Sequence, residues 1–340
     1  MHVTHKSNQM NLTEILSIQS VSYEQWRMFA YIIRQVKAIP DVSYHVTGGN
    51  IYITRGKSDT YPCIVAHMDT VHDIVEDLTP IEIDGNITGF NRIMMEQTGI
   101  GGDDKVGIYI ALSCLSKFDN IKVAFFRDEE VGCVGSYDAE VSFFNDCRFV
   151  LQCDRRGNDD FVTTASGVEL SSKQFQDDIL PIISSYGYKF AHGAMTDVMA
   201  LKESGVKCSV ANMSCGYYNP HMHTEYVNVF DVEVCLEMCE TIISCCTDTY
   251  KHKYKPRYAT PVATSYKYPK QQTKSFFDWA TPKSSAPLWT DDYPDVPTPK
   301  DEDIYCVECW AAEATKGAIS DNLCDKCRAW YHGEYNGVTF

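Results

Sequence analysis

The sequence has 340 residues, 44% of them hydrophobic and 22% charged, an ordinary globular composition that excludes a collagen, a coiled coil and a wholly disordered chain. Its formal net charge of -16 disfavours binding to nucleic acid or to anionic membranes. No apolar run reaches the roughly 20 residues that cross a bilayer, and the first residues lack the plan of a secretory signal, which predicts a cytoplasmic protein.

Composition divides the chain into three predicted regions. Residues 250–300 contain eight of the 13 prolines, with nine basic and four acidic residues, which predicts a flexible linker. Residues 301–340 contain three basic and eight acidic residues and form a small module. The charges of these two regions cancel, so the net negative charge belongs to residues 1–249, the predicted main domain.

Within residues 1–249, strand-like apolar runs alternate with helix-like runs, which is typical of an α/β domain with a largely parallel sheet. A capping box at residues 22–25 predicts a helix that begins near Trp26. Strands are predicted at residues 50–54, 62–66, 121–126, 148–153 and 208–213. Further helices are predicted at residues 105–115, 172–184, 196–203 and 229–246.

Carboxylates and histidines follow the predicted interior strands, at the point where each strand ends. Because the carboxyl ends of parallel strands lie along one edge of a sheet, these groups can converge on one crevice. Each motif alone is commonly a hydrogen-bonded pair, a solvated turn or a helix cap, so their shared position carries the argument. The groups are His67 and Asp69, Asp103 and Asp104, Glu129 and Glu130, Asp154, and His221, His223 and Glu225.

Buried carboxylates and imidazoles would repel one another or remain unsatisfied unless a cation joined them. Oxygen and nitrogen donors without thiolate suit zinc, manganese or cobalt in a catalytic site. Two such ions, about 3.5 to 4 Å apart, require a bridging carboxylate and share a hydroxide between them. The five candidate ligands of this pair are His67, Asp103, Glu130, Asp154 and His221.

Three segments of the chain resemble motifs of the di-zinc exopeptidase superfamily, which includes peptidase T, glutamate carboxypeptidases and bacterial leucyl aminopeptidases. They are VAHMDTV at residues 65–71, GGDDKVG at residues 101–107 and DEEVG at residues 128–132. The resemblance extends from about residue 12 to residue 229. It implies a three-layer αβα fold with a mixed, mostly parallel sheet, and it makes residues 1–249 a peptidase domain with two metal ions.

The resemblance also implies a role for each matching residue. His67 and Asp154 would complete one metal site, Glu130 and His221 the other, and Asp103 would bridge them. Asp69 would orient His67, and Glu129 would be the general base. His221 is preferred to His223 because a family histidine commonly stands four residues before a glutamate, as His221 stands before Glu225.

The chain departs from peptidase T and its closer relatives in one respect. Only 66 residues separate Asp154 from His221, and they already hold predicted elements of the main domain, so the sequence predicts that the lid domain of those relatives is absent. We expect a metal-dependent exopeptidase, an aminopeptidase or tripeptidase acting on short peptides. The alternatives are a carboxypeptidase, a related N-acyl amino acid deacylase or, in another class, a non-catalytic protein that binds partners through its zinc module.

Four further residues near the predicted site have two interpretations each. Arg155 and Arg156 could bind a peptide carboxylate, although neutralisation of an acidic rim is the favoured interpretation. His192 and Asp197 could contact substrate, although a structural pair is favoured.

Four of the 15 cysteines stand in two CxxC pairs near the C-terminus, separated by 14 residues. The pairs are Cys306 with Cys309 and Cys324 with Cys327, a spacing typical of a structural zinc site. A module of this size has too little core to fold without the ion. We expect it to mediate protein interaction or self-association, and we expect the other 11 cysteines to be reduced core residues.

Overall fold

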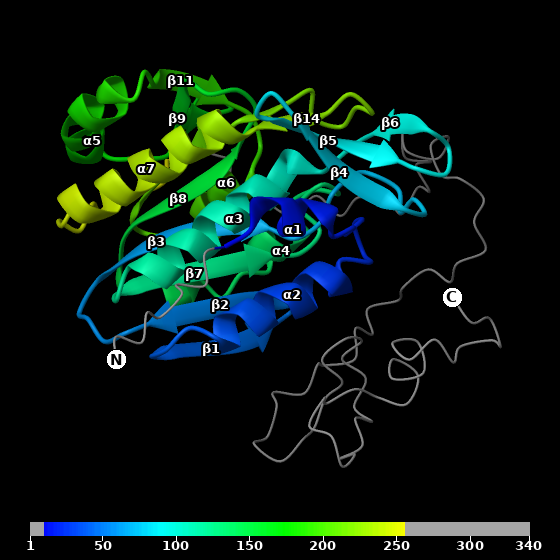
Figure 1. The fold of residues 1–340 in the computed structure, drawn as a ribbon. Helices are drawn as coiled ribbons and strands as arrows, with labels where there is room; N and C mark the ends of the chain where they lie inside the picture. Colours follow the sequence, from blue (N-terminus) through cyan, green and yellow to red (C-terminus); the bar gives the residue numbers. More distant parts are fainter. Residues whose placement is uncertain (1–9, 256–340) are drawn as a thin grey trace, which may run out of the picture.

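The computed structural model describes residues 10–255, and a nine-stranded mixed sheet forms their centre (Figure 1). The four central strands run parallel to one another, and their residues are almost all buried. In sheet order they are β7 (Ile121–Phe126), β3 (Tyr61–His67), β8 (Cys147–Arg155) and β12 (Ser209–Ser214). Burial on both faces explains why these strands read as continuous apolar runs.

Antiparallel strands extend the sheet on both sides of this parallel centre. On one side β2 (Asn50–Arg55) pairs with β7, and β1 (Val42–Thr47) pairs with β2. On the other side β9 (Asp160–Ala165) pairs with β12 and with β10 (Val168–Glu169), while β11 (Lys189–Gly193) runs parallel to β9.

Helices cover both faces of the sheet, which gives the predicted three-layer αβα architecture. One face carries the larger apolar core and is covered by α1 (Leu12–Ser17), α2 (Trp26–Lys37), α3 (Gly102–Lys117), α5 (Lys173–Ser185) and α7 (Val229–Cys245). The other face carries a separate core beneath α4 (Val134–Tyr137), the 3-10 turn Val141–Phe144 and α6 (Asp197–Glu203).

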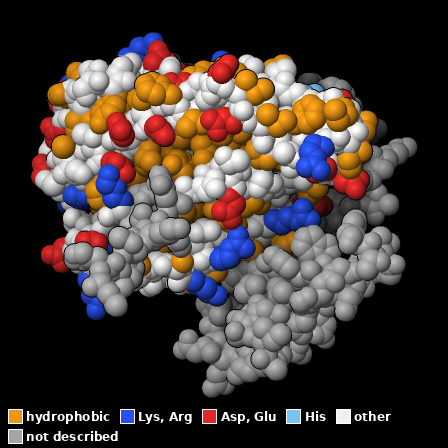
Figure 2. All heavy atoms as spheres, viewed as in Figure 1, with side chains coloured by type: hydrophobic (Ala, Val, Ile, Leu, Met, Phe, Trp, Pro, Cys, Tyr) orange, Lys and Arg blue, Asp and Glu red, His pale blue; other side chains and the backbone are white. Residues whose placement is uncertain are grey.

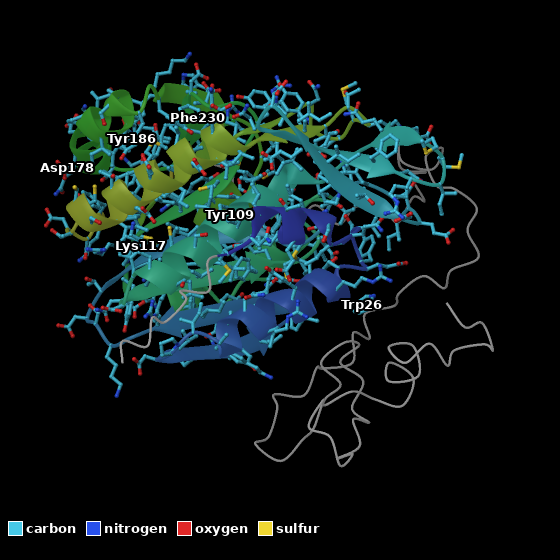
Figure 3. The ribbon with its side chains drawn as sticks, in the orientation of Figure 1. Trp26, Tyr109, Lys117, Asp178, Tyr186 and Phe230 are labelled. Atoms are coloured by element: carbon cyan, nitrogen blue, oxygen red, sulfur yellow. The ribbon has the colours of Figure 1, made fainter. Side chains whose placement is uncertain are left out.

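Polar contacts fix the helices of the larger face relative to one another. The Tyr186 hydroxyl, just beyond α5, lies 2.8 Å from the Thr241 hydroxyl of α7. Lys117, at the end of α3, forms an ion pair with Glu240 of α7. Figure 3 labels Tyr186 and Lys117 on either side of α7. In the space-filling view of this face, charged side chains of both signs are scattered among apolar ones (Figure 2).

A second, smaller sheet lies beside the carboxyl edge of the central sheet and was not predicted. Its strands come from two distant parts of the chain, since β14 (Tyr226–Asn228) pairs with β5 (Asn86–Asn91). The remaining strands are β4 (Leu78–Ile83), β6 (Glu96–Thr98) and β13 (Tyr217–Tyr218). The pairing brings the loop that contains His221 next to the start of α3.

The structure confirms the fold class and places every predicted strand and helix within a few residues of its expected bounds. The capping box at residues 22–25 is wrong, because α2 has Gln25 as its N-cap and no side-chain capping bond. Ser22 instead donates a hydrogen bond of 2.7 Å to Asp69 Oδ2. Its hydroxyl therefore supports one of the carboxylates at the strand ends and does not cap the helix.

The ordered packing continues past residue 249, the expected end of the main domain. Tyr250 is 2% exposed, and its ring centroid lies 5.0 Å from that of Phe175. The His252 carbonyl oxygen accepts a hydrogen bond of 2.9 Å from the buried Lys202 ammonium. Most of the linker and the four predicted zinc ligands of the C-terminal module, Cys306, Cys309, Cys324 and Cys327, lie outside the described residues.

Candidate metal centre and active site

The side chains predicted to converge do so at the carboxyl edge of the central strands. His67 is the last residue of β3, Asp154 lies near the end of β8, and Glu130 follows β7. Asp103 lies in the first turn of α3, and His221 lies in the loop between β13 and β14. Five segments that are far apart in the sequence therefore contribute to one cluster.

The first group of candidate ligands consists of His67, Asp103 and Asp154. The Nε2 atom of His67 lies 3.2 Å from Asp103 Oδ1 and 3.6 Å from Asp154 Oδ1. One donor atom from each of the three residues lies within 4.8 Å of the others, a spacing that can surround one ion. His67 itself is fully buried.

The second group consists of Asp103, Glu130 and His221. The Nε2 atom of His221 lies 3.3 Å from Asp103 Oδ2 and 3.2 Å from Glu130 Oε2. Asp103 therefore faces one group with Oδ1 and the other with Oδ2, as a bridging carboxylate would. The exposed His223 belongs to neither group.

Asp69 connects His67 to the loop that carries the two glutamates. Its carboxylate is fully buried and accepts hydrogen bonds from the backbone N–H of Glu129 at 2.9 Å and of Glu130 at 3.2 Å. Asp69 Oδ1 also lies 3.4 Å from Nδ1 of His67. One carboxylate thus fixes the positions of residues from β3 and from the segment after β7.

Glu129 lies beside the first group of candidate ligands. Its Oε2 atom lies 4.0 Å from His67 Nε2, and its Oε1 atom accepts a hydrogen bond of 3.3 Å from the Cys133 thiol. Burial, opposed in part by the neighbouring His67, raises the pKa of Glu129 to about 8. A carboxyl group with such a pKa is suited to exchange protons near neutral pH.

The electrostatics of the cluster indicate a shortage of positive charge. Although burial opposes it, hydrogen bonds that His67 donates to Asp103, Asp154 and Asp69 raise the pKa of His67 well above its ordinary value. Burial, together with repulsion from Asp103, raises the pKa of Asp154. In each case the neighbouring carboxylates favour the presence of a cation.

Two carboxylates that support the site were not assigned a role from the sequence. Glu225 is fully buried and accepts hydrogen bonds from the backbone N–H of Gly101 at 2.7 Å and of Asp103 at 3.2 Å. Asp104 accepts one from the His67 backbone N–H at 3.1 Å. The place of Glu225 after His221 was the only signal, because hydrogen bonds over such sequence distances leave no local pattern.

Asp154 is held by neutral donors from the sheet and from the start of α6. Its Oδ2 atom accepts hydrogen bonds of 3.1 Å from Gln152 Nε2 and from the Thr196 hydroxyl. The side-chain amide of Asn212 donates to the backbone oxygen of Asp154 at 2.8 Å. These contacts leave Asp154 Oδ1 directed towards His67.

The four residues with two sequence interpretations are now placed. Arg155 donates from Nε and Nη2 to Asp160 Oδ2, at 2.9 and 2.7 Å, whereas Arg156 is exposed. The predicted pair of His192 and Asp197 is wrong, since no hydrogen bond or ion pair joins them in residues 10–255. Asp197 is buried and accepts a hydrogen bond of 3.1 Å from Gln152, while His192 is exposed on β11.

A pocket opens beside both groups of candidate ligands. Its lining combines four carboxylates with a short wall of apolar and small residues, and Arg155 is its one basic residue apart from His221 among those described. The lining residues are Asp103, Glu129, Glu130, Asp154, Arg155, Val162, Gly193, Ala194, Met195, Thr196, Asn212, Tyr217 and His221.

Comparison with solved structures supports the fold. The chain is similar to aminopeptidase PepT from Bacillus cereus ATCC 10987, with 13% identity over 70% of this chain and 97% of that one and a TM-score of 0.54. It is similar to a tripeptidase from Staphylococcus aureus subsp. aureus Mu50, with 12% identity, 69% and 96% coverage and a TM-score of 0.55. It is also similar to aminopeptidase APDkam598 from the archaeon Desulfurococcus kamchatkensis, with 13% identity over 68% of this chain and 93% of that one and a TM-score of 0.51.

At these identities the likeness concerns the fold. A scan against protein-family models finds no match, and a search of curated proteins finds none. None of the helices in the described part of the chain has both the length and the apolar character of a membrane span.

Proposed function

We propose that this protein is a metal-dependent exopeptidase that hydrolyses short peptides with two metal ions. The observation that carries the proposal is the pair of ligand groups that share Asp103, with Glu129 beside the first group. His67 and Asp154 would hold one ion, and Glu130 and His221 the other. The three similar structures named above are aminopeptidases and a tripeptidase by their titles, which supports a peptidase.

The residues present fit a pair of divalent ions. The donors are imidazole nitrogens and carboxylate oxygens, a set that suits zinc, manganese or cobalt. Glu130 Oε1 is buried and has no hydrogen-bond partner within residues 10–255, which is costly for a carboxylate oxygen unless a cation meets it. The raised pKa of His67 likewise reflects a site that attracts positive charge.

The protein side chains would divide the chemistry of amide hydrolysis among them. When bound, the ions would lower the pKa of a water molecule to about 7 and polarise the peptide carbonyl. Glu129 would accept a proton at Oε2 from the attacking water and return it to the departing amine. Asp69 would hold the His67 ring and the Glu129 backbone in place during both proton transfers.

The pocket favours recognition of a peptide amino terminus. A free carboxylate would require an unpaired cation, whereas Arg155 already donates two hydrogen bonds to Asp160. No other Lys or Arg side chain of the described residues lines the pocket, so a terminal carboxylate has no free cation to meet there. We therefore infer that the protein is an aminopeptidase whose substrates are di- and tripeptides.

A substitution at Glu129 tests the proposed chemistry. Glu129→Gln keeps the size of the side chain but removes its capacity to accept a proton, so kcat should fall about 10²- to 10⁴-fold while both ions stay bound. Peptide hydrolysis and elemental analysis on the same preparation measure the two effects. The exposed Glu24→Gln is the matched control, and near-normal kcat in Glu129→Gln would remove Glu129 from the mechanism.

Blocked peptides test which end is recognised. Acetylation of the amino terminus removes the ammonium group, so hydrolysis of the acetylated peptide should be lost while the C-terminally amidated form is still cleaved. The reverse preference would indicate a carboxypeptidase. Cleavage of simple N-acyl amino acids in preference to both would indicate a deacylase.

We also propose that residues 301–340 bind a structural zinc ion through Cys306, Cys309, Cys324 and Cys327. The spacing of the two CxxC pairs supports this assignment. Through the linker of residues 250–300, the module would mediate protein interaction or self-association without contributing to the chemistry.

A further inference from the structure

Three buried cysteines form a sulfur cluster beneath α7, on the face of the sheet that carries the larger core. Cys153 lies in β8, and Cys235 and Cys239 lie one helical turn apart on α7. Their three sulfur atoms all lie within 4.8 Å of one another, and each residue is 0% exposed. Figure 1 shows α7 crossing over β8, which explains how the two elements meet.

A fourth sulfur atom adjoins the cluster. The Cys239 thiol lies 3.5 Å from the Cys153 sulfur and 3.6 Å from the Sδ atom of Met213 in β12. Two strands and one helix thus contribute thiols and a thioether to one point of the core. We define the sulfur cluster as Cys153, Cys235, Cys239 and Met213.

These separations match those of sulfur atoms around one metal ion. With a metal–sulfur bond of about 2.3 Å, three sulfur ligands of one ion lie about 3.8 to 4.0 Å apart. The observed sulfur separations of 3.5 and 3.6 Å lie close to this range. A donor set of thiols and a thioether, without oxygen or imidazole, selects a soft closed-shell cation.

We propose that the sulfur cluster binds one thiophilic cation, Cu(I) or Zn²⁺, at a site separate from the proposed active centre. Coordination releases to solvent one thiol proton for Cu(I) or two for Zn²⁺, and the remaining sulfur atoms bind as neutral thiol or thioether, so the buried site stays uncharged. Because the cluster is closed to solvent, the ion must enter as the chain folds. Once bound, it would fasten α7 to β8.

The site differs from the proposed active centre in how it exchanges its ion. His221 has a side chain that is 51% exposed, so a chelator can reach the active-centre ions. The sulfur cluster has no exposed member, so its ion should remain after chelation. This difference in exchange makes the two sites separable by experiment, and the inference does not depend on the proposed enzymatic function.

Thiolate spectroscopy on the full-length chain tests the proposal. The four cysteines of the C-terminal CxxC pairs are first replaced by serine, so that a thiolate signal can arise only from the remaining cysteines. This background protein is produced with cadmium as a spectroscopic probe and dialysed against a chelator. We expect about one retained cadmium per chain and an ultraviolet thiolate-to-metal charge-transfer band, with three or four sulfur neighbours in X-ray absorption spectra.

Variants within the same background assign the signal to the cluster. Cys235→Ala with Cys239→Ala should remove the band and the retained ion, whereas Cys208→Ala, a buried cysteine in the core of the other face, should keep both. Parallel production with zinc or with copper distinguishes the two natural cations by the element retained. The X-ray absorption measurement on the background protein does not depend on whether the double variant folds.

Three results would overturn the proposal. The first is a folded background protein that retains no ion or shows only oxygen and nitrogen neighbours. The second is a band that persists in the folded double variant. The third is a mass lower by two hydrogens, which would reveal a disulfide between Cys153 and a neighbour in place of the ion.

Discussion

Asp69 illustrates how much of the proposed centre depends on one buried carboxylate. It accepts hydrogen bonds from the Ser22 hydroxyl and from the backbone N–H groups of Glu129 and Glu130, and it faces Nδ1 of His67. Both oxygen atoms are therefore used as acceptors. A side chain with one acceptor and one donor cannot satisfy the same neighbours.

Asp69→Asn is expected to lower activity although it preserves the shape of the side chain. The new amide NH₂ must face the backbone N–H of Glu129 or Glu130, which is also a donor. Repulsion between the two donors shifts the loop that carries these glutamates, or shifts His67. Turnover or metal affinity should fall about 10- to 100-fold. Kinetic and metal-titration measurements should show this loss, while the control Ser22→Ala, which removes one hydrogen bond, should cost about 1 kcal/mol of stability. Wild-type behaviour of Asp69→Asn would contradict the role assigned to it.

At the scale of the secondary-structure elements, Lys202 joins α6 to the segment that follows α7. Its buried ammonium donates to the backbone oxygens of Val206 at 2.6 Å, Cys208 at 2.8 Å and His252 at 2.9 Å. Burial lowers the pKa of Lys202 from its ordinary value of 10.5 to about 8. The helix, the strand that follows it and the segment after α7 therefore meet at one titratable group.

Lys202→Met should destabilise the fold in a way that depends on pH. At pH 7 the variant leaves three buried acceptors without a donor, at a cost of about 1 to 3 kcal/mol or more. Between pH 8 and 10.5 the unfolded wild-type chain keeps the Lys202 proton that the folded chain has lost, so wild-type stability rises with pH relative to the variant. The gap should therefore widen with pH.

Denaturant unfolding at several pH values measures this gap. Exposed Lys207→Met, which removes no side-chain hydrogen bond found in the described residues, is the control and should show little change. A variant as stable as wild type at pH 7, or a gap that narrows above pH 8, would contradict the account of Lys202.

At the scale of the whole molecule, burial explains why the sequence predicted the central parallel strands but not the strands of the second sheet. The four parallel strands are buried on both faces, so each reads as an apolar run, and the polar residue after it is conspicuous. This pattern located His67, Glu130 and Asp154. The second sheet escaped prediction because β4 is half exposed and because β14 pairs with a strand far away in the chain.

The same contrast applies to the residues of the candidate site. The strand ends and the motif resemblance predicted the side chains that face the proposed ions, and also Asp69 beside His67, but they assigned no role to Glu225 or Asp104. Glu225 supports the turn at Gly101 and Asp103 across more than 120 residues, a relation that depends on the pairing of the second sheet. Packing between distant segments, rather than local propensity, determines such contacts.

Anomalous X-ray diffraction from crystals of the full-length protein grown with zinc tests the central claim most directly. Data collected on either side of the zinc absorption edge should show two peaks at the carboxyl edge of the sheet, about 3.5 to 4 Å apart. One peak should lie among His67, Asp103 and Asp154, and the other among Asp103, Glu130 and His221. A single peak there, or none at saturating zinc, would contradict the two-ion centre and with it the proposed peptidase.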